Sequence, residues 1–167
     1  MAKINIIAAI DNNRAIGYQN KLLFHIDEDM KHFKQLTMGH SIVMGRRTYE
    51  SLPNGALPHR RNIVVSTTMK QRELEEGYSY HKQQGIEVFS SLTEALAACA
   101  NEDDIYIIGG EKIYQQAIAF AHRLYLTIID ASAPHADAWF PPFDGWLLKE
   151  DSPRQGYSFR VYERVKK

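Results

Sequence analysis

Short apolar runs recur along the chain and are separated by longer polar or mixed stretches. The first run, Ile4 to Ile10, is interrupted only by Asn5 and is followed by three polar residues. A continuous apolar run of this length is typical of a strand that is buried on both faces of a covered sheet. Five further runs repeat the pattern, at 41–44, 62–65, 86–89, 105–108 and 124–129. The pattern therefore predicts six buried strands.

Helical patterns lie between these runs, at 27–36, 46–51, 91–100 and 111–120. The third of them opens with Ser91 and has Glu94 three residues later, which fits a capping box. Alternating strands and helices predict an α/β fold, with a mostly parallel central sheet that is flanked by helices.

Two regions depart from this alternation. After Asp130 the chain becomes rich in proline and glycine, and the segments 146–148 and 157–161 predict an antiparallel hairpin at one edge of the sheet. Residues 66–85 are polar and show no clear pattern.

Composition limits the classes of function. A chain of 167 residues that is 44% hydrophobic can bury one core, so we expect a single domain spanning 1–167. Lys plus Arg and Asp plus Glu number 20 each, so no global field recruits nucleic acid or a membrane surface. The amino-terminal apolar run is too short for a signal peptide, and we expect a cytoplasmic protein. The chain has one cysteine, Cys99, in a helical pattern that suggests packing, so no internal disulfide is expected. Its seven histidines are scattered without the spacing of metal ligands, so no metal site is expected.

The helix predicted at 27–36 carries an acid on its apolar face. At about 100° per residue, Asp29 falls inside the apolar stripe, whereas Asp27 and Glu28 point away from it. An apolar pocket raises the proton affinity of a carboxyl group. Asp29 is therefore suited to act as a proton donor, or to bind a flat ligand that offers paired N–H groups. The alternative is that all three acids only favour the positive end of the helix dipole. The stripe consists of Ile26, Met30, Phe33 and Leu36.

Glycines mark two places where a predicted strand runs into a helix. Gly45 is followed by Arg46, Arg47 and Thr48, and the next strand ends in Ser66 and Thr67. Helix-start N–H groups, guanidiniums and hydroxyls at the carboxyl ends of strands suit a phosphate group. Gly109 and Gly110 follow Ile108 at the second place and allow close approach of a ligand. This segment lacks the G-x-G-x-x-G spacing. Simple turn formation is the alternative at both places.

Two further features complete the candidate set. Arg60 and Arg61 lie next to each other just before a strand, and their paired guanidiniums suit the carboxylate of a substrate, although a plain basic turn is an equal alternative. Thr127 places a hydroxyl inside an apolar strand and is in position to bond Asp29 across the sheet. Its alternative is a β-branched residue that only fills the strand.

Taken in order, these segments resemble the dihydrofolate reductase family from Ile6 to about Phe140. The resemblance rests on six motifs in register, which are Ile7-Ala8-Ala9 with Ile16-Gly17, Asp29 with Phe33, Val43-Met44-Gly45-Arg46-x-Thr48, Leu57-Pro58-x-Arg60-x-Asn62, Ile108-Gly109-Gly110-x-x-x-Tyr114, and Tyr125-Leu126-Thr127. It implies a mostly parallel sheet of about eight strands with an antiparallel C-terminal edge. It also implies a monomer that reduces 7,8-dihydrofolate to 5,6,7,8-tetrahydrofolate for one-carbon metabolism.

By this resemblance, Asp29 grips the 2-amino and ring N–H groups of the pterin and promotes protonation at N5, and Thr127 steadies Asp29. Arg60 holds the glutamate α-carboxylate of the substrate. The pterin is bordered by Ile7, Phe33 and Tyr114. The implied cofactor is NADPH, with its pyrophosphate at Gly109 and Gly110 through a cis peptide. Its remaining contacts are Ala9, Ile16 and Gly17 at the nicotinamide, Gly45, Arg46, Arg47, Thr48, Ser66 and Thr67 at the adenosine phosphates, and Ile108, Lys112 and Tyr114.

The chain departs from the family before the acid. The family usually has Pro-Trp where this chain has Leu23 and Phe24, and proline where it has Asp27. The missing indole N–H removes a donor that orders a water near the substrate.

Three other functions fit parts of the pattern. A related-fold reductase acting on a riboflavin-pathway pyrimidine would need neither Arg60 nor Asp29. A nucleotide- or RNA-binding module would use Arg46-Arg47 and Arg60-Arg61, although the balanced net charge disfavours it. A homologue that binds folate without catalysis is the third.

Overall fold

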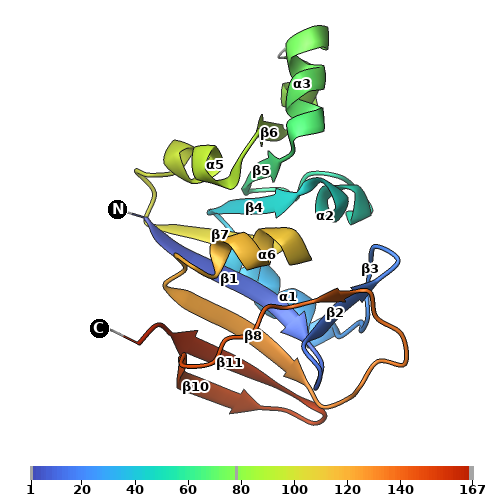
Figure 1. Ribbon diagram of the computed structural model, residues 1–167, viewed down its shortest axis with the longest axis vertical. Helices are drawn as coiled ribbons and strands as arrows, with labels where there is room; N and C mark the ends of the chain where they lie inside the picture. The colour runs from blue at the N-terminus through green and yellow to red at the C-terminus, as the bar shows by residue number, and fades with distance from the viewer. Residues whose placement is uncertain (1, 78, 166–167) are drawn as a thin grey trace.

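Eight strands form one sheet in the computed structural model, which describes residues 2–77 and 79–165 (Figure 1). The strands are β1 (Lys3–Ile10), β4 (Ser41–Gly45), β5 (Arg61–Val65), β6 (Ile86–Phe89), β7 (Asp104–Gly109), β8 (Arg123–Ile129), β10 (Leu147–Pro153) and β11 (Tyr157–Glu163). Their order across the sheet is β10-β11-β8-β1-β7-β4-β5-β6. All six predicted apolar runs are strands of this sheet.

Pairing within the sheet is parallel from β8 to β6 and antiparallel at the other edge. β1 lies between β7 and β8 and is parallel to both, and β4 lies in the same way between β7 and β5. β11 is antiparallel to β8, and β10 is antiparallel to β11. The predicted fold class, with its antiparallel C-terminal hairpin, is confirmed.

Helices cover both faces of the sheet. α5 (Leu92–Ala98) and α6 (Glu111–Ala117) lie in front of it in Figure 1, and α1 (Asp27–Thr37) lies behind. α2 (Arg46–Ser51) follows β4. These are the four predicted helices, with α5 and α6 ending a few residues earlier than the pattern indicated. Among the described residues, no helix is long and apolar enough to cross a membrane.

The two faces of the sheet bury separate apolar clusters. Ile6 contributes to the cluster beneath α5 and α6, and its neighbour Ile7 contributes to the cluster facing α1. Successive side chains of a strand point to opposite faces, so a strand covered on both sides must be apolar at every position. This explains why the strands are continuous apolar runs rather than alternating ones.

The structure also contains elements that the pattern did not indicate. Residues 66–85 include α3 (Thr67–Glu76) and α4 (Ser79–Gln83), and α3 extends away from the rest of the molecule in Figure 1. The side chain of Ser66 caps α3 by accepting a hydrogen bond from the Met69 N–H at 3.1 Å. A second, three-stranded sheet consists of β3 (Lys21–Leu22), β2 (Ala15–Tyr18) and β9 (Ala138–Trp139).

The apolar stripe predicted on α1 is wrong for Met30, whose exposed fraction is 55%. The inward face of α1 is centred on Asp29, Phe33 and Leu36, and Met30 lies about 100° away from Asp29 around the helix axis. His32, which the stripe omitted, is half-buried against the sheet. The prediction that Asp29 faces inward is nevertheless confirmed.

Phe140 anchors the segment that follows β9 in the core. Its exposed fraction is 0%, and its ring lies 5.0 Å from that of Tyr114 and 5.9 Å from that of Phe143, measured between centroids. We predict that Phe140→Ala lowers the free energy of unfolding by about 3–5 kcal/mol, because it leaves a cavity. Phe120→Ala, at a 46% exposed position, is the matched control and should cost less than about 1 kcal/mol. Urea unfolding measures the free energy of unfolding of both variants. Equal losses of stability would contradict the role of Phe140 as a core anchor.

Candidate active site

Asp29 lies on the first turn of α1 and faces the sheet. Its Oδ1 accepts a hydrogen bond from the hydroxyl of Thr127, which is buried on β8, so the bond expected between these side chains is present. Burial raises the pKa of Asp29 above its usual range, and the Thr127 hydrogen bond and the nearby His32 oppose this only in part. Asp27 points into solvent, with 86% of its side chain exposed. Asp29 is therefore a carboxyl group that holds its proton more tightly than an ordinary aspartate.

Residues of β1 lie beside this acid. Ala9 is the register partner of Thr127, and Ile7 is the partner of Tyr125 on the same neighbouring strand. The buried hydroxyl of Tyr114, on α6, donates to the backbone carbonyl of Ile7 at 2.8 Å. Burial, together with the charge of Asp29, raises the pKa of Tyr114. The structure thus brings Asp29 and α6 together at the paired strands β1 and β8.

The two glycine-marked strand exits adjoin each other. Met44 pairs with Gly109 across β4 and β7, so both exits lie at the carboxyl ends of neighbouring strands. A Cβ atom at Gly45 would lie 3.2 Å from Ile113 Cγ1, and one at Gly110 would lie 3.3 Å from the hydroxyl oxygen of Thr48. The Gly109–Gly110 peptide is cis, as expected. These glycines allow the starts of α2 and α6 to pack closely.

Both helices begin without a side-chain cap. The N-cap residues Gly45 and Gly110 make no such hydrogen bond, whereas Ser66 and Ser91 cap α3 and α5. The first-turn N–H groups of α2 and α6 are therefore not capped by an N-cap side chain, and such groups favour a negative charge. This cradle of glycines and uncapped N–H groups fits the phosphates of a dinucleotide.

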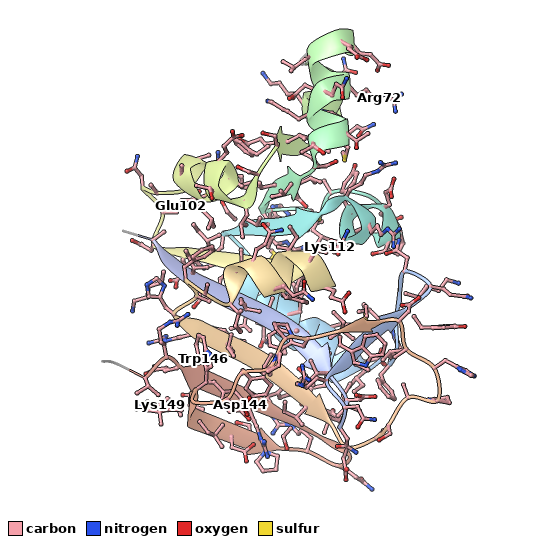
Figure 2. The ribbon with its side chains drawn as sticks, in the orientation of Figure 1. Arg72, Glu102, Lys112, Asp144, Trp146 and Lys149 are labelled. Atoms are coloured by element: carbon pink, nitrogen blue, oxygen red, sulfur yellow. The ribbon has the colours of Figure 1, made fainter. Side chains whose placement is uncertain are left out.

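Cationic residues surround these helix starts. Arg46, Arg47 and Lys112 are exposed on the first turns of α2 and α6, and Lys112 is labelled in Figure 2. Arg46 also pairs with Glu50, with 3.2 Å between Nε and Oε2. Thr67, which follows the capping residue of α3, is exposed one strand farther along.

Arg60, directly before β5, and Arg61, its first residue, make different contacts. Arg61 bonds Glu87 at 2.6 and 2.8 Å and Glu102 at 2.8 Å, so it holds β5, β6 and the segment after α5 together (Figure 2 labels Glu102). The expectation that both arginines fork onto a substrate carboxylate is therefore wrong for Arg61. Arg60 donates only to neutral oxygens, those of Pro58 at 2.9 Å and Thr37 at 3.1 Å. Within residues 2–77 and 79–165, no carboxylate pairs with its guanidinium.

The small sheet links the loop before α1 to α2. Ile16 packs against the core cluster, and Gly17 pairs with Leu22 of β3 and with Ala138 of β9. Asn20, in the turn after β2, donates to the carbonyl of Arg47 at 3.0 Å. Sequence reasoning missed Asn20, because a turn asparagine carries no signal of a contact 27 residues away.

Two further predicted residues, Ile108 and Phe33, belong to the apolar cluster between α1 and the sheet. Ile108 is half-buried in the cluster that faces α1 and directly precedes the glycine pair, and Phe33 packs against that cluster from α1. Phe24, which stands where the family has tryptophan, is half-buried in the segment between β3 and α1.

This geometry defines an open α/β protein with a candidate ligand site at the carboxyl edge of its sheet. A family model described as dihydrofolate reductase matches residues 3–164. The dihydrofolate reductase of Buchnera aphidicola subsp. Acyrthosiphon pisum is 41% identical over 96% of this chain and 99% of its own length. The dihydrofolate reductase of Bacillus subtilis is 38% identical over 96% of this chain and 94% of its own length. Dihydrofolate reductase HdrB of Haloferax volcanii is 36% identical over 95% of this chain and 82% of its own length. The chain belongs to the dihydrofolate reductase family.

The raised pKa of Asp29 predicts a pH-dependent effect on stability. The folded protein binds this proton more tightly than the unfolded chain, so ionisation of Asp29 destabilises the fold once the pH rises through the folded pKa. Asp29→Asn removes this cost and keeps an oxygen for Thr127. We expect its Tm at pH 7 to exceed that of the parent by about 1–3 °C, with the gain vanishing below about pH 4. Calorimetry, with Asp27→Asn as the exposed control, tests this; a lower Tm at pH 7 would contradict it.

Proposed function

We propose that this chain reduces 7,8-dihydrofolate to 5,6,7,8-tetrahydrofolate with NADPH. The observation that carries the proposal is the inward carboxyl group of Asp29, which Thr127 holds on the strand that pairs with β1, in the same sheet as the adjoining glycine exits. The chemistry that bound NADPH would supply is a hydride for C6 of the substrate C6=N5 bond. The protein supplies binding, alignment and a proton.

Asp29 would bind the 2-amino and ring N–H edge of the pterin. A carboxylate accepts two such hydrogen bonds side by side, and the Thr127 hydroxyl fixes the orientation of the group. The raised pKa enlarges the fraction of molecules in which Asp29 keeps its proton, and in that fraction the group would promote protonation at N5, which makes C6 a better hydride acceptor. Ile7, Phe33 and Tyr114 would form the walls around the pterin, and Arg60 would bind the α-carboxylate of the glutamate tail.

The adjoining helix starts would hold NADPH. Its pyrophosphate would lie against Gly109 and Gly110, and its adenosine phosphates against Arg46, Arg47, Thr48, Ser66 and Thr67. Ala9, Ile16 and Gly17 would border the nicotinamide, which fits the pairing of Ala9 with Thr127. Gly45, Ile108 and Lys112 would complete the surroundings of the cofactor.

The contacts of the arginines disfavour the nucleic-acid alternative. Arg61 is engaged by two glutamates and Arg46 pairs with Glu50, so the two arginine pairs do not make one free basic surface. The names of the relatives favour dihydrofolate over the riboflavin-pathway pyrimidine.

We predict that Asp29→Asn lowers the turnover of dihydrofolate at neutral pH by about 100-fold or more, because a proton source and an ionic contact are both lost. Its affinity for NADPH should stay within about twofold of the parent, since the cofactor lies at the glycine exits. Loss of absorbance at about 340 nm measures turnover, and fluorescence titration measures NADPH binding. Asp27→Asn, with the same change two residues away, should keep parental turnover. Activity of Asp29→Asn within a few-fold of the parent would exclude Asp29.

Arg60→Met should raise KM for dihydrofolate by about 10- to 100-fold, because a bidentate contact to the α-carboxylate is lost. The value of kcat should change little, since this contact is made equally in the ground and transition states. A dihydropterin without the glutamate tail provides the control, and the substitution should not alter its kinetics. Equal losses with both substrates would contradict the role of Arg60.

A further inference from the structure

The C-terminal hairpin contacts the first turn of α1 at a residue that has no role above. Glu28 Oε1 accepts hydrogen bonds from the Tyr157 hydroxyl at 2.8 Å and from Arg154 Nε at 3.0 Å. Tyr157 begins β11, and Arg154 lies in the turn between β10 and β11. These hydrogen bonds hold the pKa of Glu28 below its usual range. The hairpin is thus tied to the residue directly before Asp29.

A ring contact joins the hairpin to the next turn of α1. His32 stacks on Phe159 of β11, with 4.3 Å between ring centroids and 26° between the planes. The Arg154 guanidinium also lies over the Phe159 ring, 5.3 Å from its centroid. Phe159 is the register partner of Thr127, whose hydroxyl bonds Asp29. The hairpin is therefore linked to Asp29 by two routes, one through Glu28 and one through the strand pairing of Phe159 with Thr127.

Apart from the Thr127–Asp29 hydrogen bond, the first turn of α1 has few other anchors among the described residues. The N-cap residue, Ile26, makes no side-chain hydrogen bond, and Met30 is exposed. The apolar contacts of α1 with the sheet cluster come from Phe33 and Leu36, farther along the helix. Contacts to Glu28 are therefore well placed to decide where the first turn lies.

We propose that Arg154 and Tyr157 are positioning residues for Asp29, which they act on through Glu28. The proposal rests on the function proposed above, in which Asp29 must meet a flat substrate edge. A displacement of about 1 Å at a reacting group can lower a rate by up to 100-fold. Exposed ion pairs contribute little to stability, so the effect should appear in turnover rather than in melting temperature.

The test compares the double variant Arg154→Met/Tyr157→Phe with the parent. Both changes keep the size of the side chain and remove the donors to Glu28. We expect kcat for dihydrofolate to fall about tenfold, with KM for NADPH within about twofold and Tm within about 3 °C of the parent. The single variant Arg154→Lys, which keeps Tyr157, retains two hydrogen-bond donors to Glu28, and its kcat should stay within about threefold of that of the parent.

Arg160→Met is the matched control. Arg160 lies on the same hairpin and pairs with Asp151 at 3.3 Å, but this pair lies within the hairpin. Its loss should leave kcat unchanged. If the double variant and Arg160→Met have the same kcat, the proposal is overturned. A Tm loss of many degrees with KM raised for both ligands would assign the hairpin a merely structural role and would also overturn it.

A second readout does not depend on activity. Carbon-13 titration of the Asp29 carboxyl group in the ligand-free protein should give a lower pKa in the double variant, because a displaced first turn exposes Asp29 to water. An unchanged pKa of Asp29 in the double variant would overturn the positioning proposal. If the parent protein failed to reduce dihydrofolate, that result would refute the proposed function only, and the pKa comparison would still test the positioning proposal. The ionisable groups that face Asp29 or its neighbours in this region are Glu28, His32, Tyr114, Arg154 and Tyr157.

Discussion

The hydrogen bond between Thr127 and Asp29 joins α1 to the centre of the sheet, and the chemistry of the site depends on it. A carboxylate that leaves water loses hydration free energy, so it needs a partner or must hold its proton. Thr127 offers one donor, which only partly offsets the effect of burial. The residue is left poised to exchange a proton and to accept the hydrogen bonds of a ligand.

The parallel sheet provides the second half of the site. Strands that run side by side end at one edge, and here β4 and β7 both end in glycine before an uncapped helix. An ordinary side chain at Gly45 or Gly110 would press on Ile113 or on Thr48 at 3.2–3.3 Å. Glycine therefore lets the two helix starts pack closely, and neither start carries a side-chain cap. The acid and this cradle are linked through β1, whose Ala9 lies beside Thr127.

Features that depend on local chemistry were predictable from the sequence. A strand covered on both faces must be apolar throughout, so β1 and its neighbours were visible as continuous runs. Asp29 was found because one acid among three fell on the inward side of a helix. The glycine exits were visible because few other residues would follow a strand in that way.

Features that depend on distant contacts were not predictable. Ser66 was noted as a hydroxyl near a phosphate, but nothing local indicated that it caps a ten-residue polar helix. Met30 was placed inward because the register of α1 could not be fixed to within one residue. The division of labour between Arg60 and Arg61 became clear only when the fold brought Glu87 and Glu102 to Arg61. The link from Arg154 to Glu28 spans 126 positions in the chain.

The pH dependence of hydride transfer from NADPH to dihydrofolate tests the central claim most directly. It can be followed as the loss of absorbance at about 340 nm in single turnovers. We expect the rate to fall about tenfold per pH unit above an apparent pKa that exceeds the ordinary aspartate value of about 3.9. A rate that stays constant from about pH 5 to pH 9 would contradict the claim that the buried carboxyl group of Asp29 controls the proton.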